Sequence, residues 1–327
     1  MRENNKEYDL ALSWHDNQRT PFIKWLREGC AEKELNFMQI HDGNISEIIE
    51  KLEERRIHIH FLLDMHATYN SPGDLYARLC YTVKDTGGRV IGDPDHVRFS
   101  IDKSISHYTF MRNNIPVPYT IIIRSWQLDR IKVPDDIKKE LGVPFIIKPA
   151  MGFGGKGVVT DAQWKLKNIT MARNFDRTDH YLLQEKINPI IINEKPAWFR
   201  IYYVFGTIIP CWWNPSTGEY IHMSRKDFAA HHLSALREFP PIISQVTGMD
   251  WFSTEIAYYK KKGATAPVVV DYINDQCHVD VQSMFPGAPP DHVVKCISET
   301  MVEAADHYSK GLAYRRKNDF WLDRNNA

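Results

Sequence analysis

The first part of the chain alternates short apolar runs with amphipathic stretches. The runs have the length of strands, and the stretches between them carry apolar residues at helical spacing. The predicted strands are 8–14, 35–40 and 58–64, and the predicted helices between them are 22–34 and 44–56. Strands that alternate with helices are typical of a parallel sheet with crossover helices. We therefore expect a small parallel α/β unit at the N-terminus.

The remainder of the chain lacks this regular alternation. Its pattern predicts helices at 95–114, 134–141, 164–174, 231–247 and 291–308. It predicts strands at 119–123, 143–148, 158–160, 181–187, 198–209, 252–259 and 266–273, with a turn at Pro210. Strands here follow one another as often as they follow helices, which is typical of an α+β arrangement. The basic tail from Tyr314 onward is expected to fray.

A glycine-rich loop separates two apolar runs between Val143 and Asp161. Lys148 precedes the loop and Lys156 lies within it. The glycines of the loop are Gly152, Gly154, Gly155 and Gly157. Glycines permit positive φ angles and leave backbone N–H groups uncovered. Together with the two lysines, they are typical of a phosphate-binding cradle.

Other interpretations of this loop are open. Residues 152–157 also fit the dinucleotide-binding pattern G-x-G-x-x-G, and Asp176 lies at a suitable distance. That pattern requires a helix to begin within the glycines, whereas β-branched residues follow Gly157. We therefore favour a strand–loop–strand flap, with a ligand-free glycine-rich hairpin as the alternative. No Lys-Ser or Lys-Thr follows the glycines, which excludes the Walker pattern.

Two carboxylates lie on either side of a turn near Gly263. A hairpin there would place Glu255 opposite Asp271, and cross-strand neighbours lie about 5 Å apart. Facing carboxylates repel unless a cation or a proton lies between them, and oxygen-only ligands favour Mg²⁺. Asn274 would add a neutral oxygen, and a second hairpin would instead bring Asp280 opposite Asp271. Solvated carboxylates on a hairpin are the alternative interpretation.

Composition narrows the class of protein. Forty-one basic residues balance forty-one acidic ones, which gives no support for a nucleic-acid or membrane-surface partner. The five cysteines are widely scattered, which argues against a disulfide framework or a zinc site and suits a reducing cytosol. His58, His60 and His66 lack a nearby carboxylate cluster and do not favour a metal site. Without an apolar signal segment or a run of membrane-spanning length, we expect a cytoplasmic protein.

The order of motifs between Asp102 and Gly287 resembles the ATP-grasp superfamily. The segments that carry the resemblance to D-alanine–D-alanine ligases and to the ribosomal-protein glutamate ligase type are 102–103, 115–118, 145–149, 183–187 and 199–200. The sequence departs from the family pattern at the metal motif. Asp271 stands where Glu is usual, Asn274 is shifted, and Glu255 stands where the first ligand is usually Asp. Trp198 stands where the glutamate ligase type has Asp.

The resemblance implies a role for each matching residue. Lys103, Lys148 and the glycine loop, including Lys156, would hold the phosphates of ATP. In the hinge at 184–187, Glu185 would accept a hydrogen bond from the adenine amino group. The other hinge residues are Gln184, Lys186 and Ile187. Arg200 would steady a phosphate or the acyl intermediate. Glu255, Asp271 and Asn274, with Asp280 as a rival, would hold Mg²⁺ or Mn²⁺.

The resemblance also implies a fold and an activity. The fold is α/β (α+β grasp), with an N-terminal parallel α/β lobe at 1–95 followed by two α+β subdomains, 96–184 and 185–327, that clasp ATP. The activity is an ATP-dependent carboxylate–amine or carboxylate–thiol ligation through an acyl-phosphate, which releases ADP and phosphate. The substrates would be a small-molecule or peptide carboxylate and an amine acceptor, and a homodimer is compatible.

Three further points stay open at the level of sequence. Arg225 and Asn214 are candidate substrate contacts by position only. A small-molecule kinase on the same scaffold is one alternative activity, with Asp280 or His278 as the base. A non-catalytic ATP-binding regulatory module is the other alternative.

Overall fold

The structure is a computed structural model of the chain. It describes residues 5–14, 20–66, 73–124, 133–152, 154–165, 168, 172 and 176–323. Contacts divide the chain into two compact units. Unit 1 comprises 1–97, 200–253 and 275–327, and unit 2 comprises 98–199 and 254–274. The division into 1–95, 96–184 and 185–327 stays a prediction, because it groups the chain by motif order rather than by contacts.

A four-stranded parallel sheet forms the N-terminal part of unit 1, as the sequence predicts. Its strand order is β3 (Phe37–Ile40), β2 (Leu10–Ser13), β5 (Phe61–Asp64) and β6 (Arg89–Ile91). The expected strands 8–14 and 58–64 are each divided in two. Their first halves, β1 (Lys6–Tyr8) and β4 (Ile57–Ile59), pair with each other in a separate parallel ladder.

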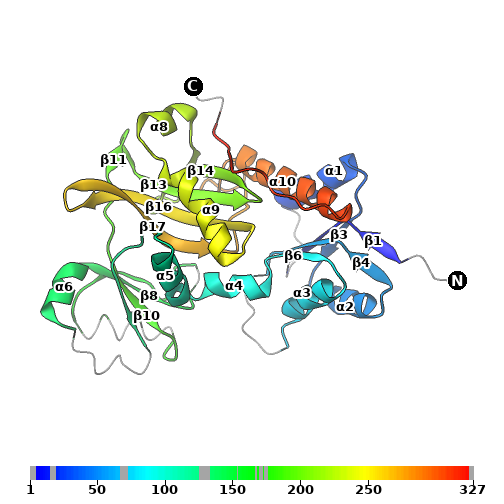
Figure 1. Cartoon of the computed structure of the whole chain (residues 1–327), viewed down its shortest axis with the longest axis horizontal. Coiled ribbons are helices and arrows are strands. Elements are labelled where there is room, and N and C mark those ends of the chain that lie inside the picture. The colour runs from blue at the N-terminus through cyan, green and yellow to red at the C-terminus, as the bar shows by residue number, and fades with distance from the viewer. Residues whose placement is uncertain are drawn as a thin grey trace. The chain divides into compact units, whose positions relative to one another are not determined.

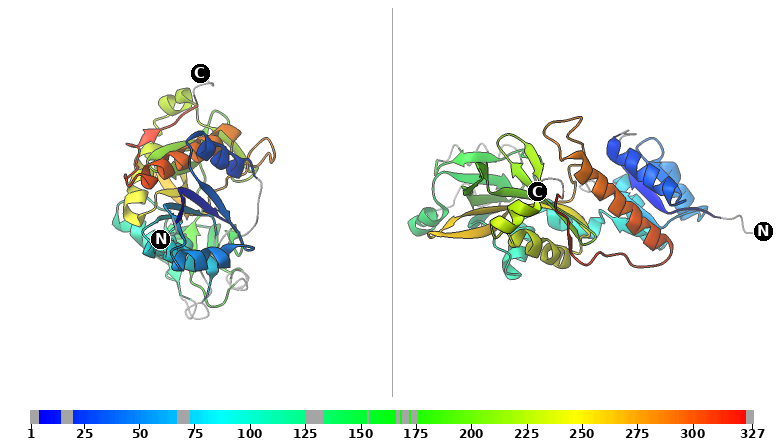
Figure 2. Two further views of the ribbon diagram at one scale, coloured as in Figure 1. Left: turned by 90° about the vertical axis from the view of Figure 1, so that its right-hand side faces the viewer. Right: turned by 90° about the horizontal axis from the view of Figure 1, so that it is seen from above.

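Helices cover both faces of this sheet because its side chains alternate between two apolar cores. Leu10 and Leu12 belong to one core and Ala11 to the other. Helices α2 (Ile45–Glu53) and α3 (Leu75–Asp85) bury their apolar residues in the second core. The first core is covered by α1 (Pro21–Glu32) together with α10 (Asp291–Ser309), which lies alongside α1 (Figures 1 and 2). A helix from the far end of the chain thus completes the N-terminal sheet.

A second sheet has the strand order β15-β14-β13-β16-β17. Its strands are β13 (Trp198–Val204), β14 (Thr207–Asn214), β15 (Glu219–His222), β16 (Trp251–Lys261) and β17 (Ala264–Asn274). The prediction of one strand over 198–209 with a turn at Pro210 was wrong. The chain turns at Phe205 and Gly206, which have φ angles of 46° and 85°. A Cβ on Gly206 would lie 1.9 Å from the Arg316 carbonyl oxygen, so only glycine fits there.

Two helices connect β15 to β16 in the chain. These are α8 (Arg225–Ala230), capped by the Ser224 side chain, and α9 (Ala235–Thr247), which ends at Gly248 in the left-handed region. The expected helix from 231 to 247 therefore begins later than predicted.

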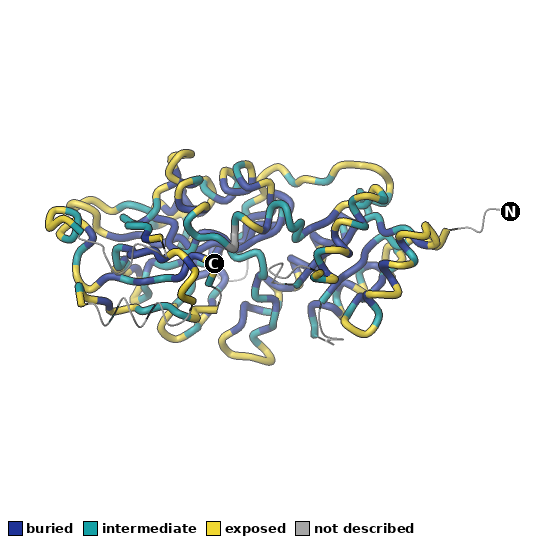
Figure 3. Tube along the Cα trace, turned by 90° about the horizontal axis from the view of Figure 1, so that it is seen from below, coloured by how far each residue is buried: buried dark blue, intermediate teal, exposed yellow. Residues whose placement is uncertain are grey.

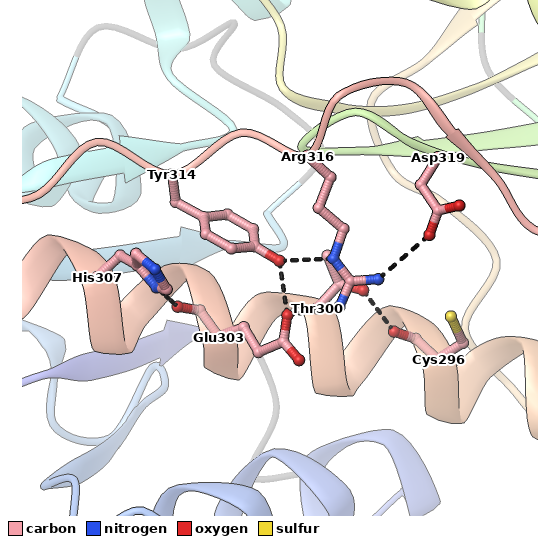
Figure 4. Close-up of polar contacts among 7 residues, drawn as sticks. All are labelled: Cys296, Thr300, Glu303, His307, Tyr314, Arg316 and Asp319. Carbon is pink, nitrogen blue, oxygen red and sulfur yellow. Dashed lines mark hydrogen bonds and ion pairs between the residues drawn. The ribbon is translucent and has the colours of Figure 1, made fainter.

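The C-terminal tail is docked rather than frayed, so that expectation was wrong. The Arg316 backbone N–H donates to the Phe205 carbonyl at 2.7 Å. Strand β18 (Asp319–Phe320) then pairs in parallel with β14. Figure 4 shows the Arg316 guanidinium between two carboxylates, 2.5 Å from Glu303 on α10 and 3.7 Å from Asp319. The basic residues of the tail have partners on other elements, which a local pattern does not reveal.

Unit 2 contains a four-stranded antiparallel sheet, and helices accompany it in the described part of the chain. The strand order is β7 (Thr120–Ile123), β10 (Tyr181–Glu185), β8 (Phe145–Pro149) and β9 (Val159–Ala162). The expected helix over 95–114 is two helices, α4 (Pro94–Ile101) and α5 (Lys103–Arg112). The break falls at Asp102, whose carboxylate accepts the backbone N–H groups of Ser104 and Ile105 as an N-cap. Helix α6 (Asp135–Leu141) agrees with the sequence, and β11 (Ile191–Ile192) pairs with β12 (Lys195–Pro196).

The glycine loop joins β8 to β9, and these strands pair antiparallel. Residues 154–157 form turns between them, which confirms the strand–loop–strand interpretation over the dinucleotide pattern. The expected helix at 164–174 lies largely outside the described residues.

The predicted hairpin near Gly263 is confirmed. Strands β16 and β17 flank Lys262 and Gly263, whose φ angles of 50° and 87° suit a tight turn. Burial follows the strands, whereas exposed residues gather in the loops (Figure 3). All five cysteines are buried with free thiols. Among the described residues, no helix combines the length and the apolar character of a membrane span.

Candidate functional site

The antiparallel sheet of unit 2 has one apolar face and one polar face. Phe145 and Ile147 of β8 are fully buried in an apolar core, so the residue between Ile147 and Pro149, Lys148, lies on the opposite face. Lys148 pairs across the ladder with Leu182, and Gln184 pairs with Ile146. Lys148 and Gln184 therefore share the polar face.

Lys148 is the central charge on this face. Its ammonium donates to the Val270 carbonyl on β17 at 3.3 Å. Burial lowers the pKa of Lys148, and the nearby Lys103 lowers it further. The carboxylates of Asp271 and Glu255 act in the opposite direction. The site thus gathers two cations and two carboxylates within electrostatic reach of one another.

Lys103 connects α5 to the glycine loop. Its backbone N–H donates to the Ala150 carbonyl at 2.9 Å, and its ammonium donates to the Gly152 carbonyl. Neither Lys103 nor Lys148 has a carboxylate oxygen within 4.0 Å among the described residues. Both ammonium groups therefore hold only neutral carbonyl partners.

The loop itself requires its glycines. A Cβ on Gly152 would lie 2.5 Å from Cγ of Pro149, and three further glycines of the loop have positive φ angles. Those three are Gly154, Gly155 and Gly157. Lys156 is exposed among them. Backbone N–H groups left uncovered by side chains, with Lys148 before them and Lys156 among them, favour anions.

Gln184 lies at the centre of a buried polar network. Its side-chain amide donates to the Tyr272 hydroxyl at 3.0 Å, and the same hydroxyl lies 2.7 Å from Nδ1 of His107. Gln184 is 1% exposed, and its Oε1 has no hydrogen-bond partner in the described part of the chain. A buried acceptor without a donor is costly, so this atom marks a position where a ligand donor would fit.

Sequence reasoning missed Tyr272 and His107. Burial lowers the pKa of His107 to about 4, which keeps its ring neutral and able to share a hydrogen bond with Tyr272. The available signals were a tyrosine within the apolar strand β17 and a histidine on the buried side of α5. Neither signal separates a polar network from ordinary core packing.

The hinge borders an open pocket of about 570 Å³, a volume within the usual range for small-molecule sites. Glu185 lines this pocket, and its carboxylate accepts the backbone N–H of Tyr119 at 3.2 Å. Lys186 forms an ion pair with Asp161 of β9 at 2.6 Å, and Ile187 is buried in a small core. The pocket is also lined by 114–120 and 260–262.

The structure brings three of the predicted metal ligands into unit 2. Glu255 accepts a hydrogen bond from the indole of Trp198 at 2.9 Å, and Asn274 donates to the Asp271 carboxylate at 3.0 Å. The carboxylates of Asp271 and Glu255 both act to raise the pKa of Lys148. The rival, Asp280, belongs to unit 1, where its carboxylate lies 3.2 Å from Nε2 of His278.

The remaining candidates also belong to unit 1. Arg200 on β13 lies over the ring of Trp213, 5.4 Å from its centroid. Asn214 ends β14, where its side chain accepts the Ser216 backbone N–H and thereby stabilises a turn. Arg225 is exposed at the first position of α8. This turn is sufficient to explain why asparagine occupies position 214, so a substrate contact is not needed to account for it.

The groups of unit 2 fit a nucleoside triphosphate with a divalent cation. Two lysines without carboxylate partners and a glycine-rich loop suit phosphates. The Oε1 atom of Gln184 is an acceptor suited to a hydroxyl or amino donor. Glu255, Asp271 and Asn274 offer the oxygen atoms that Mg²⁺ prefers.

Comparison with known proteins agrees with this fit at the level of the fold. The sequence matches no protein-family model and no curated protein. Solved structures do resemble the chain. D-alanine–D-alanine ligase from Bacillus anthracis complexed with ATP is 16% identical, with a TM-score of 0.59 and coverage of 94% of this chain and 99% of that one.

Two further structures are similar. A RimK domain protein ATP-grasp from Sphaerobacter thermophilus DSM 20745 is 15% identical (TM-score 0.57), with 90% of this chain and 98% of that one covered. The ATP-grasp ligase PsnB complexed with precursor peptide PsnA2 and AMPPNP is 9% identical (TM-score 0.56), with 93% and 100% covered. These likenesses run over almost the full length of every chain compared. The protein has the ATP-grasp fold.

Proposed function

We propose that the protein is an ATP-dependent ligase that joins a carboxylate to an amine, or to a thiol, and releases ADP and phosphate. The observation that carries this proposal is the pair of lysines at the glycine loop, Lys148 and Lys103, whose ammonium groups bond only to backbone carbonyls among the described residues. Both side chains are half-buried, and a cation withdrawn from water needs an anion or a dense set of acceptors. Within an ATP-grasp fold, a triphosphate supplies that anion.

The residues of unit 2 would act mainly by alignment and charge neutralisation, which are the principal means of phosphoryl-transfer catalysis. Lys148 and Lys103 would hold the phosphates, and the glycine loop would cover them. Glu185 and the Lys186–Ile187 backbone would contact the adenine. Mg²⁺, when bound by Glu255, Asp271 and Asn274, would neutralise further phosphate charge.

A peptide carboxylate is a reasonable substrate class. PsnB was solved with a precursor peptide, and also with Mg and ADP, which supports both a peptide substrate and Mg²⁺ for this chain. The substrate carboxylate would attack the γ-phosphate to give an acyl-phosphate and ADP. The amine would then displace phosphate. No side-chain nucleophile is required, in keeping with five buried thiols.

The decisive experiment is product analysis with MgATP and mixtures of amino acids or peptides. ADP, free phosphate and a condensed product support the ligase. ADP with a phosphorylated product would indicate a kinase, for which His278 beside Asp280 is the candidate base. Tight nucleotide binding without turnover would indicate a regulatory module.

The Lys148→Ala variant tests the site itself. Losing the buried ammonium should weaken ATP binding by about 100-fold, since a charge-assisted contact to phosphate contributes about 1.5–3 kcal/mol. Lys138→Ala is the matched control, because Lys138 lies in the same unit and pairs with Asp135 on the surface of α6. Calorimetric titration with ATP measures both. Unchanged binding and turnover in Lys148→Ala would contradict the proposed site.

A further inference from the structure

A second cluster of ligand-type side chains lies in unit 1, where the docked tail ends. It consists of His222 at the end of β15, His292 in the first turn of α10, and Asp323 three residues after β18. One ligand atom from each lies within 4.8 Å of the other two. Three segments far apart in the sequence therefore present two imidazoles and a carboxylate to one point.

The orientation of His222 leaves one nitrogen available to this cluster. Its Nε2 lies 3.1 Å from the Trp321 carbonyl oxygen, an acceptor only, so Nε2 carries the proton and donates. In a neutral ring, Nδ1 is then the lone-pair nitrogen, and it points at Nε2 of His292 at 3.0 Å. The indole of Trp321 stacks on the His222 ring at 4.5 Å and 20°, which holds the ring in place. An imidazole fixed by a backbone carbonyl on its other nitrogen is the usual arrangement of a metal-binding histidine.

The spacing of the two nitrogens also suits a shared metal ion. Ligand nitrogens about 2.0–2.1 Å from one zinc ion lie roughly 3.3 Å apart at a tetrahedral angle, and the observed separation is 3.0 Å. A carboxylate completes three protein ligands and leaves a fourth position for water. The other account is a hydrogen bond from His292 to His222 with Asp323 as a bystander.

We propose that His222, His292 and Asp323 form a binding site for a divalent transition metal, with Zn²⁺ as the best fit, that ties the C-terminal tail to β15 and α10. The tail already follows this route, since the Asp323 backbone N–H donates to the Met223 carbonyl at 3.0 Å and Trp321 donates to Ile208 at 2.9 Å. His292 is exposed, so the ion can enter from solvent and exchange with a chelator. None of these three residues is among the proposed nucleotide-binding residues of unit 2, because all three belong to unit 1.

The test uses the full chain, stripped with a chelator and free of nucleotide. Titration with Zn²⁺ by calorimetry should show one ion per chain, and Co²⁺ should give the visible absorption of a tetrahedral or five-coordinate site. His292→Ala should weaken Zn²⁺ binding by more than about 100-fold, since even the partners behind a ligand change affinity by about 10–100-fold. Asp323→Ala should weaken it as well.

The matched control is His307→Ala, because His307 lies on α10 like His292 but its Nδ1 lies 2.8 Å from the Glu303 carbonyl oxygen of its own helix. This variant should bind Zn²⁺ as the native chain does. A second readout follows the tail, since bound Zn²⁺ should slow tryptic cleavage after the exposed Lys317 in the native chain and not in His292→Ala. Equal Zn²⁺ affinity in the native chain and in His292→Ala would overturn the proposal, and so would the absence of binding to a folded native chain. Neither result bears on ATP binding, which is measured separately.

Discussion

The parallel sheet of unit 1 and the antiparallel sheet of unit 2 bury their side chains in different ways. Both faces of the parallel sheet are lined by apolar residues that helices cover. One face of the antiparallel sheet is equally apolar, but its other face carries Lys148 and Gln184 against β17. Burying charge and amide groups is unfavourable without full pairing. The difference therefore separates a sheet whose two faces are both apolar from a sheet whose polar face suits the proposed ligand.

The largest effect should come from the apolar sheet. Phe61 is fully buried and packs against the rings of Phe205 and Tyr308 at centroid distances of 5.9 Å and 5.7 Å. Phe61→Ala should lower the free energy of unfolding by about 3–5 kcal/mol. Chemical denaturation measures this loss. The affinity of the folded fraction for ATP should not change, and a parallel loss of affinity would remove the distinction between the two sheets.

A smaller, pH-dependent effect should come from the polar face. The folded-state pKa of His107 is about 4, below its ordinary 6.5. The unfolded chain therefore takes up a proton first as the pH falls. Stability that is fully present above pH 6.5 should be lost progressively between pH 6.5 and 4, by up to about 3 kcal/mol.

His107→Gln should flatten the dependence of the unfolding free energy on pH between 6.5 and 4, because glutamine does not titrate and can still form a hydrogen bond with Tyr272. Denaturation curves between pH 4 and 7 provide the comparison. His278 and His58, whose pKa values burial also lowers, should contribute to the slope that remains. An unchanged slope in His107→Gln would show that the neutral His107 ring is not part of the buried network.

The smallest effect has the opposite sign. Lys148→Met removes a cation whose pKa burial lowers, while retaining much of the side-chain volume. Near neutral pH the variant should gain about 1 kcal/mol in unfolding free energy, the low end of the range for replacing buried charges by apolar groups. It should also lose ATP binding. Denaturation and ATP titration on the same sample test both parts, and a loss of stability would mean that Lys148 is held for structure.

Local pattern was sufficient for much of this fold. The β-α-β-α-β alternation predicted the parallel sheet, and the β-branched residues after Gly157 predicted a strand rather than a helix. The hairpin around Gly263 followed from two apolar runs and a polar turn. Each of these features depends on residues that are neighbours in the sequence, where periodicity and turn chemistry act directly.

Long-range contacts escaped such reasoning. The turn at Phe205 and Gly206, the docking of the tail, and the place of α10 beside α1 depend on partners far away in the chain. The same is true of the candidate sites. Lys148 and Lys103 were predicted from the motifs that contain them, whereas Tyr272 and His107 acquire meaning only through their contact with each other and with Gln184.

The sequence by itself determined the order of the elements, the glycine loop and the chemical types of the groups around it. Only the tertiary structure decided which of those groups are buried together and which carry no charged partner. It also placed His222, His292 and Asp323 at one point. The physical reason is that propensity and periodicity act over a few residues. Burial, which sets the cost of a charge and the value of a hydrogen bond, is a property of the packed chain.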